Sequence, residues 1–188
     1  MLLGTVGLRW GEAALRPMDL EPKRNRISIT RSESKAGNSV EVVSPKTGAR
    51  SVAVPTDVMR LLVRRSADRP VDGLLWPNKF GGAMVSPGHN SWFSGAVRDC
   101  MEPRDPVIGK RVRDPSFPRV TPYRLRHVAA GLIIQAGANV KMVSAQLGHA
   151  SAKQTLDTYA HLWHDGLDRM MQSHGADVVK LQSRAGDL

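Results

Sequence analysis

Apolar residues recur along this chain at two different spacings, and each spacing marks a different kind of element. Residues 26–31 alternate isoleucine with polar side chains, which is the period of a half-buried strand. Two further β-rich runs, Val40–Val43 and Val52–Val54, flank residues 45–48, whose proline and glycine supply turn chemistry. The pattern therefore predicts a small antiparallel sheet of about three strands at residues 26–55, with Lys46 at or beside a hairpin tip.

Most of the remaining chain has helical spacing. Thr121 and Pro122 form a strong helix start, an N-cap oxygen followed by a proline at the first helical position, and Gly137 can end that helix in the left-handed conformation. The predicted helices are Leu2–Leu15, Thr56–Ala67, Asn90–Met101, a helix from Thr121 to Gly137, Val140–Leu147, and a helix after Ser151 that carries Tyr159.

Capping signals define the last two of these helices. Asn139 can cap the first, which stops at Gly148, and Ser151 with Gln154 forms a capping-box pattern for the second. On the helix that starts at Thr121, the positions expected to be buried are Leu125, Val128, Ala129, Leu132 and Ile133, whereas Tyr123, Arg126 and Ala130 fall on a different face.

The order of these elements predicts an α+β protein, mainly α-helical, with one small antiparallel sheet near its N-terminal side. Residues 68–88 and 102–119 are rich in proline and lack periodicity, so both are predicted to be loops, the first with a short extended piece at Leu74–Trp76. We expect one domain at residues 1–165 and a tail at residues 166–188. The apolar residues Val178, Val179 and Leu181 favour one more helix in that tail.

The composition is that of a soluble globular protein. The 188 residues are 41% hydrophobic and 23% charged, and no apolar run approaches the roughly 20 residues of a membrane-spanning helix. The opening MLLGTVGL lacks a basic region and is not expected to be a signal peptide, so we expect a cytoplasmic protein. The single cysteine, Cys100, cannot form an internal disulfide or a cysteine-based zinc cluster.

Net charge says more about the partner of this chain than composition does. The chain has 27 basic and 17 acidic side chains, a net charge of +10, which favours a polyanionic partner such as double-stranded DNA. A basic interaction protein without any nucleic-acid role is the alternative, in which self-repulsion serves only solubility.

Several side chains have the chemistry that phosphodiester cleavage needs without a metal. The Tyr159 hydroxyl can act as nucleophile, the guanidinium groups of Arg9 and Arg126 can hold phosphate oxygens, Lys46 can protonate a leaving oxygen, and His149 can donate to the phosphate or accept a proton. Four of these five have a simpler interpretation: a surface ion pair with Glu12 for Arg9, a solubilising side chain for Lys46, a packing role for Tyr159, and a helix terminator for His149. A zinc site at His161 and His164 is not favoured, since the chain has no HExxH pattern.

Five motifs occur in a fixed order: GLRWGE, KTGARSVAVP, RLRH, QLGH and TLDTYAHL. Together they resemble the catalytic domain of the tyrosine recombinases, the phage integrase family, over residues 2–165. The resemblance implies DNA cleavage through a 3′-phosphotyrosine link with release of a 5′-hydroxyl, no cofactor, no metal, and a tetramer on paired DNA sites. It further implies that the catalytic residues are Arg9, Lys46, Arg126, His149 and Tyr159, with Lys35 as a rival for the lysine.

The sequence departs from the family in two respects. Tyr123 stands where the family most often has histidine, three residues before Arg126, so the identity of the proton acceptor is open. Tyr123, His127 and Glu12 are expected to give supporting contacts. The N-terminal domain with which the family clamps DNA is expected to be absent, which implies weak DNA binding, a monomer, and cleavage with religation at most.

Two alternatives within the same fold remain open from the sequence. A catalytically silent DNA-binding remnant would keep the basic surface without the reaction, and a relaxing topoisomerase would use the same chemistry without paired sites.

Overall fold

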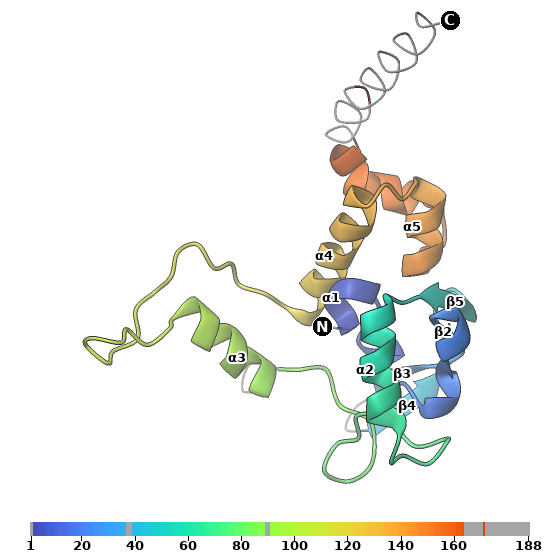
Figure 1. Ribbon diagram of the computed structural model, residues 1–188, viewed down its shortest axis with the longest axis horizontal. Coiled ribbons are helices and arrows are strands. Elements are labelled where there is room, and N and C mark those ends of the chain that lie inside the picture. The colour runs from blue at the N-terminus through green and yellow to red at the C-terminus, as the bar shows by residue number, and fades with distance from the viewer. Residues whose placement is uncertain (1, 37–38, 89–90, 164–170, 172–188) are drawn as a thin grey trace, which may run out of the picture. The chain divides into compact units, whose positions relative to one another are not determined.

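A computed structural model describes residues 2–36, 39–88, 91–163 and 171 (Figure 1). The chain forms two compact units, unit 1 at Met1–Ala129 and unit 2 at Ala130–Leu188. Helix α4 (Pro122–Gln135) contains the boundary between them.

Two small antiparallel sheets occupy unit 1. The first has strand order β1–β2–β5, from β1 (Leu20–Glu21), β2 (Arg26–Ile29) and β5 (Arg50–Ala53), and the second pairs β3 (Ser32–Ala36) with β4 (Ser39–Val43). A three-stranded antiparallel sheet is thus confirmed, but the predicted pairing of Val40–Val43 with Val52–Val54 is wrong. Ile27 lies opposite Val52 instead, because these side chains form one apolar face, whereas Val42 on β4 is 61% exposed.

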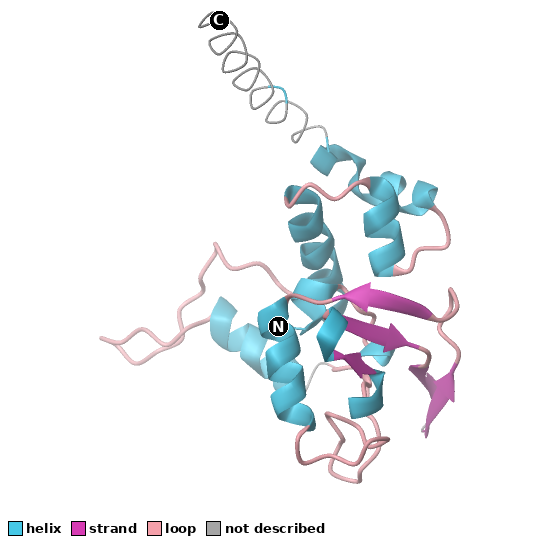
Figure 2. Ribbon diagram, turned by 45° about the vertical axis from the view of Figure 1, so that its right-hand side comes forward, coloured by secondary structure: helices cyan, strands magenta, loops and turns pink. Residues whose placement is uncertain are grey.

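The core of unit 1 lies between its three-stranded sheet and helix α2 (Thr56–Ser66) (Figure 2). This helix, as predicted, is amphipathic, and Val58, Met59 and Leu62 form its buried side. They share one hydrophobic cluster with Ile27, Ile29, Val52, Val6, Leu8, Leu15 and Leu75. Burial of these side chains is the main force that stabilises the small sheet.

The predicted helix Leu2–Leu15 is wrong. Helix α1 (Leu2–Val6) ends at Gly7, whose φ of +78° is left-handed, and a separate 3₁₀ turn, η1 (Gly11–Ala13), follows. The backbone N–H of Arg9 donates to the Glu12 carboxylate at 2.9 Å instead of to a carbonyl one turn earlier. The left-handed Gly7 and the Glu12 carboxylate, which accepts from the N–H of Arg9, are therefore the local causes of the break.

Two other short 3₁₀ turns, η2 (Pro17–Asp19) and η3 (Pro22–Arg24), precede the sheet. Residues 68–88 and 102–119 are mostly turns and loops, as predicted, and the second holds one isolated bridge between Arg104 and Arg111. Leu74–Trp76 is not a strand. Leu75 is buried instead, and its N–H donates to the Leu15 carbonyl at 2.8 Å. Helix α3 (Trp92–Met101) begins after Ser91, whose hydroxyl accepts from the N–H of Ser94.

Unit 2 is helical in its described residues. Helix α5 (Val140–Leu147) has the predicted bounds: the Asn139 side chain accepts from the N–H of Met142 at 2.9 Å, and Gly148 ends the helix with φ of +65°. Residues 152–163 are helical, and the Ser151 hydroxyl accepts from the N–H of Gln154. The core contains Ala130, Ile134, Val143, Leu147 and Tyr159. The predicted tail helix lies outside the described residues.

The buried face of α4 differs from the predicted one. Val128 and Leu132 are each 51% exposed, whereas Arg126, Ala129, Ala130 and Ile134 are buried. The small side chains of Ala129 and Ala130 permit close packing on that face. The buried Arg126 donates a hydrogen bond to the Gly7 carbonyl. None of the helices that the structure describes is long and apolar enough to cross a membrane.

Candidate active site

Three charged side chains form a buried cluster in unit 1, the arginine–glutamate cluster of Arg9, Glu12 and Arg50. Nη1 of Arg9 lies 2.9 Å from Oε1 of Glu12, and the Arg50 guanidinium contacts both carboxylate oxygens, at 3.0 and 2.8 Å. Glu12 is 2% exposed, and the side chains of Arg9 and Arg50 are 28% and 11% exposed. The predicted pairing of Arg9 with Glu12 is present, but it is not a surface ion pair.

The charge of Glu12 follows from this geometry. Burial by itself raises the pKa of the carboxyl, but hydrogen bonds from Arg50 and from the Arg9 backbone, with the positive charge of Arg50, outweigh burial and hold the pKa below its ordinary value. Glu12 is therefore a carboxylate at neutral pH. It fixes the guanidinium of Arg9, which keeps part of its surface in solvent.

Arg50 was missing from the predicted site residues. It opens strand β5 and lies on the same face as buried Val52, because side chains two residues apart share a face of a strand. The sequence did contain a signal: an arginine at an inward position of an alternating strand requires an acidic partner. What the sequence lacked was the identity of that partner, 38 residues away.

Arg126 lies on α4 and is 3% exposed. Its Nη1 donates to the carbonyl of Gly7 at 2.6 Å. Gly7, at the break after α1, therefore contacts Arg126, one of the two predicted phosphate-binding arginines. The other, Arg9, follows Gly7 by two residues in the sequence. A left-handed glycine at this break is what turns the carbonyl toward the guanidinium.

The two aromatic side chains on either side of Arg126 contact each other. Tyr123 and His127 are one helical turn apart, and their rings meet edge to face with centroids 4.8 Å apart. Tyr123 is 67% exposed. Burial, with the positive charges of Arg126 and Arg124, lowers the pKa of His127 below its ordinary value, so the ring is neutral at pH 7.

Lys46 lies in the turn between β4 and β5, which closes through a hydrogen bond of 2.9 Å from the Gly48 N–H to the Pro45 carbonyl. Its side chain is exposed and forms no hydrogen bond or ion pair within the part of the chain that the structure describes. Because β4 and β5 belong to different sheets, the predicted hairpin tip is wrong, and the turn connects two sheets instead. The rival Lys35 lies in β3, where its backbone is opposite Val40.

His149 and Tyr159 lie together in unit 2. The N–H of His149 donates to the Ser144 carbonyl at 3.0 Å, and Nδ1 lies 2.8 Å from the hydroxyl of Thr155. The rings of His149 and Tyr159 are parallel, with an angle of 4° and centroids 6.4 Å apart. Tyr159 is 4% exposed, so the ring also has the packing role that the simpler interpretation assigns to it.

Across residues 2–36, 39–88, 91–163 and 171, no three His, Cys, Asp or Glu side chains are close enough to hold a metal ion. His161 is exposed, and His164 lies outside the described residues.

Comparison with known proteins gives one family. The sequence profile of the phage integrase family matches residues 1–165, a span that contains every candidate residue above. The transposase from transposon Tn916 of Enterococcus faecalis is 26% identical over 178 residues, which are 88% of this chain and 42% of that protein. Tyrosine recombinase XerC of Bifidobacterium longum subsp. infantis is 33% identical over 82 residues, 43% of this chain and 23% of that protein. The chain thus spans less than half the length of these relatives.

Among solved structures, the integrase of transposon Tn1549 in complex with circular intermediate DNA is similar in fold. The TM-score is 0.68 at 22% identity, and the match covers 90% of this chain and 57% of that one. At this identity the likeness concerns the fold, and it agrees with a mainly helical chain with a small antiparallel sheet.

Proposed function

Because the chain belongs to the phage integrase family, we propose that it cuts and rejoins DNA strands at specific sites through a covalent 3′-phosphotyrosine intermediate. The observation that carries the proposal is the family match over residues 1–165, which includes Arg9, Lys46, Arg126, His149 and Tyr159. The arginine–glutamate cluster adds support, since it prepares one cation for an anionic ligand.

In the proposed reaction, the Tyr159 oxygen attacks the phosphorus and the bond to the 5′ oxygen breaks. The tyrosine proton passes to a base, and Lys46 gives a proton to the departing oxygen, so a 5′-hydroxyl is released. Rejoining is the reverse: a 5′-hydroxyl attacks the phosphotyrosine and Tyr159 leaves. An exposed lysine in a turn suits the acid, because its flexible stem can reach the leaving oxygen.

Arg9 and Arg126 are the proposed ligands of the non-bridging phosphate oxygens. Planar guanidinium groups bind such oxygens in pairs and stay charged at any working pH. Glu12 and Arg50 act through Arg9 as positioning residues. The hydrogen bond from Nη1 of Arg126 to the Gly7 carbonyl helps to fix the direction of the guanidinium plane.

His149 is the proposed proton acceptor, because it is the imidazole beside Tyr159 in the described part of unit 2. Tyr123, exposed on α4, is proposed to donate its hydroxyl to a phosphate oxygen in place of the usual histidine. His127 packs against Tyr123 and supports it. Tyr159 is buried in the free chain, so its hydroxyl must gain exposure when DNA binds.

The assembly is also part of the proposal. The resemblance to the family implies double-stranded DNA as partner and four copies on two paired sites. Residues 1–188 span 42% of the Tn916 transposase, so we propose that these residues alone bind DNA as a monomer and cleave and religate single strands.

Covalent trapping on a pool of nicked duplexes with randomised sequence tests the reaction, because loss of the short fragment beyond the nick prevents rejoining. We expect an adduct that survives denaturing electrophoresis with the wild-type chain and none with Tyr159→Phe. The chain has only one other tyrosine, so Tyr123→Phe is the matched control and should still form the adduct, more slowly.

Three outcomes would replace this proposal. An adduct that persists in Tyr159→Phe would remove Tyr159 as nucleophile. DNA binding without any adduct would identify a catalytically silent DNA-binding protein, and relaxation of plasmids without paired sites would identify a topoisomerase.

A further inference from the structure

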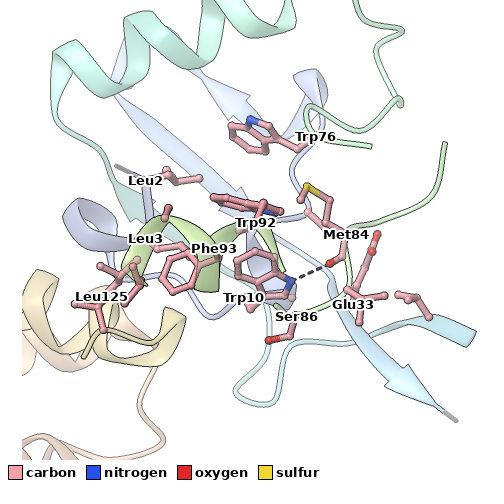
Figure 3. A pocket seen from close by; sticks show the side chains of 18 of the residues that line it. Leu2, Leu3, Trp10, Glu33, Trp76, Met84, Ser86, Trp92, Phe93 and Leu125 are labelled. Carbon is pink, nitrogen blue, oxygen red and sulfur yellow. Dashed lines mark hydrogen bonds between the residues drawn. The ribbon is translucent and has the colours of Figure 1, made fainter. Parts of the chain in front are cut away.

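A cavity of about 820 Å³ lies in unit 1, beside the N-terminal helix (Figure 3), and its lining contains none of the three residues of the arginine–glutamate cluster. We call it the tryptophan cavity, because its walls contain Trp10, Trp76 and Trp92, together with Phe93, Leu2 and Leu3. The indole N–H of Trp10 is satisfied by the Met84 carbonyl at 2.8 Å, so Trp10 presents mainly apolar surface to the cavity. An apolar concavity of this volume is in the range of sites that bind ligands.

One wall of the cavity is a helix face without a packing partner. Helix α3 has no buried residue, although apolar side chains recur along it at helical spacing. Those side chains line the cavity: Trp92, Phe93, Ala96, Val97 and Cys100. Trp92 is 63% exposed. An amphipathic helix is normally stabilised by burial of this stripe, so the described residues leave α3 without its main stabilising contact.

The cavity also holds a carboxylate without a sufficient partner. The side chain of Glu33 is 8% exposed and lines the cavity, and its Oε2 accepts no hydrogen bond from any residue that the structure describes. Arg31 is 3.7 Å from the other oxygen, too far for a hydrogen bond. Burial raises the pKa of Glu33 above its ordinary value, and Arg31 opposes the rise only in part. A buried carboxylate in this state favours a cationic donor.

We propose that the tryptophan cavity is the docking site of an amphipathic helix that is apolar on one face, carries one lysine or arginine for Glu33, and belongs to polypeptide other than residues 1–188. The shape argues for a helix: the stripe from Trp92 to Cys100 extends for about 12 Å, more than two helical turns. The Glu33 carboxylate in the cavity wall is the reason to expect a lysine or arginine on the docked helix. The proposal goes beyond the proposed function and depends on no catalytic residue.

The source of the helix is argued from the relatives. The Tn916 transposase is more than twice as long as the part that this chain matches, so homologous proteins contain polypeptide that could supply such a helix. Docking of a helix face into an apolar groove is a common recognition mode, in which anchors at helical spacing give affinity and a single charge gives register.

Selection from a displayed library of amphipathic helices of roughly four turns tests the proposal, with the full 188-residue chain as target. We expect enriched helices to share an apolar stripe and one basic position, and to shift the emission of the cavity tryptophans to shorter wavelength. Glu33→Gln should weaken the enriched helices by roughly tenfold or more, because a charge-assisted hydrogen bond is lost.

Ala96→Arg is the blocking variant, since it places a charge on the cavity wall, and Gly95→Arg is its matched control. Gly95 does not line the cavity, and a Cβ there meets nothing within 4 Å. We expect Ala96→Arg to abolish helix binding and Gly95→Arg to leave it unchanged. No enrichment, equal binding to both variants, or enriched helices without a basic position would overturn the proposal. Concentration-dependent dimerisation that Ala96→Arg abolishes would overturn it as well, because the occupant would then be a second copy.

Discussion

Glu12 is buried in unit 1 and the side chain of Glu33 is mostly buried, but their surroundings act on the two carboxyl groups in opposite directions. Two guanidinium groups and a backbone N–H surround Glu12 and hold its pKa below the ordinary value. Glu33 has one distant arginine, and burial raises its pKa. The first carboxylate is therefore part of a complete ionic cluster, and the second is a destabilising charge in the free chain. Glu12→Gln should therefore lower the stability of the folded chain, and Glu33→Gln should raise it.

Glu12→Gln should destabilise the chain by about 3–5 kcal/mol at pH 7, because it leaves two arginines without their buried counter-ion. A lowered folded-state pKa stabilises above the unfolded pKa, and this stabilisation is lost as pH falls through the folded value. The difference between wild type and variant should therefore shrink below about pH 4. Urea unfolding across pH measures it, with exposed Glu41→Gln as control. A constant difference down to about pH 2 would show that packing, not charge, stabilises the site.

Glu33→Gln should raise the melting temperature at pH 7 by about 2–4 °C, roughly the effect of 1 kcal/mol in a chain of this size. A raised folded-state pKa means that ionisation is less favourable in the folded chain, so wild type loses stability as pH rises through the unfolded and then the folded pKa. Near pH 3.5, where the Glu33 carboxyl is mostly protonated in the folded state, wild type and Glu33→Gln should have about the same melting temperature. Calorimetry at the two pH values decides, and a variant less stable than wild type at pH 7 would contradict the expected sign.

Individual site residues could be predicted where chemistry and short spacing were sufficient. Arg9 and Glu12 are three residues apart, and their ion pair follows from that spacing even though the predicted helix does not form. The contacts of Arg50 with Glu12 and of Arg126 with Gly7 join residues 38 and 119 positions apart. No local pattern contains such partners. The roles assigned to the five catalytic residues stay predictions.

Elements could be predicted best where their ends are determined by neighbouring residues. Helix α5 has the predicted bounds because Asn139 is a local start signal and Gly148 a local stop signal, and no tertiary contact overrides them. Helix α1 is shorter than predicted because Gly7 adopts a left-handed conformation whose carbonyl is used by a distant arginine. The predicted β4–β5 hairpin fails for a similar reason, since strand pairing depends on apolar faces that meet only in the folded sheet.

Gly7→Ala tests the break after α1. A Cβ in the left-handed region costs about 1–2 kcal/mol, and relaxation of the backbone would turn the Gly7 carbonyl away from Arg126. We expect a loss of that size in the free energy of unfolding, measured by urea denaturation. Gly4→Ala is the matched control: it lies inside α1, a Cβ there meets Leu125 at an ordinary 3.8 Å, and alanine favours helix. If both variants lose equal stability, the left-handed conformation of Gly7 is not the cause.

At the scale of the whole molecule, the net charge of +10 is consistent with a DNA partner, but the count of 27 basic side chains overstates the number of cations available for phosphates. Arg16 and Arg50 are held by buried carboxylates, and Arg60 by a neighbouring aspartate. Lys46, by contrast, is exposed in a turn. Affinity for DNA should thus depend on a limited number of exposed cations.

Salt titration of DNA binding measures that number. If about five phosphates are neutralised, the logarithm of affinity should fall with a slope of about −4.5 against the logarithm of salt concentration, so doubling the salt weakens binding roughly 20-fold. If Lys46 contacts a phosphate, Lys46→Gln should make the slope shallower by about one, because one fewer counterion is released. Glu41→Gln, at an exposed position on β4, is the control for a change of net charge without loss of a phosphate ligand. Binding that does not respond to salt would exclude an electrostatic interface and favour a basic protein whose partner is not a nucleic acid.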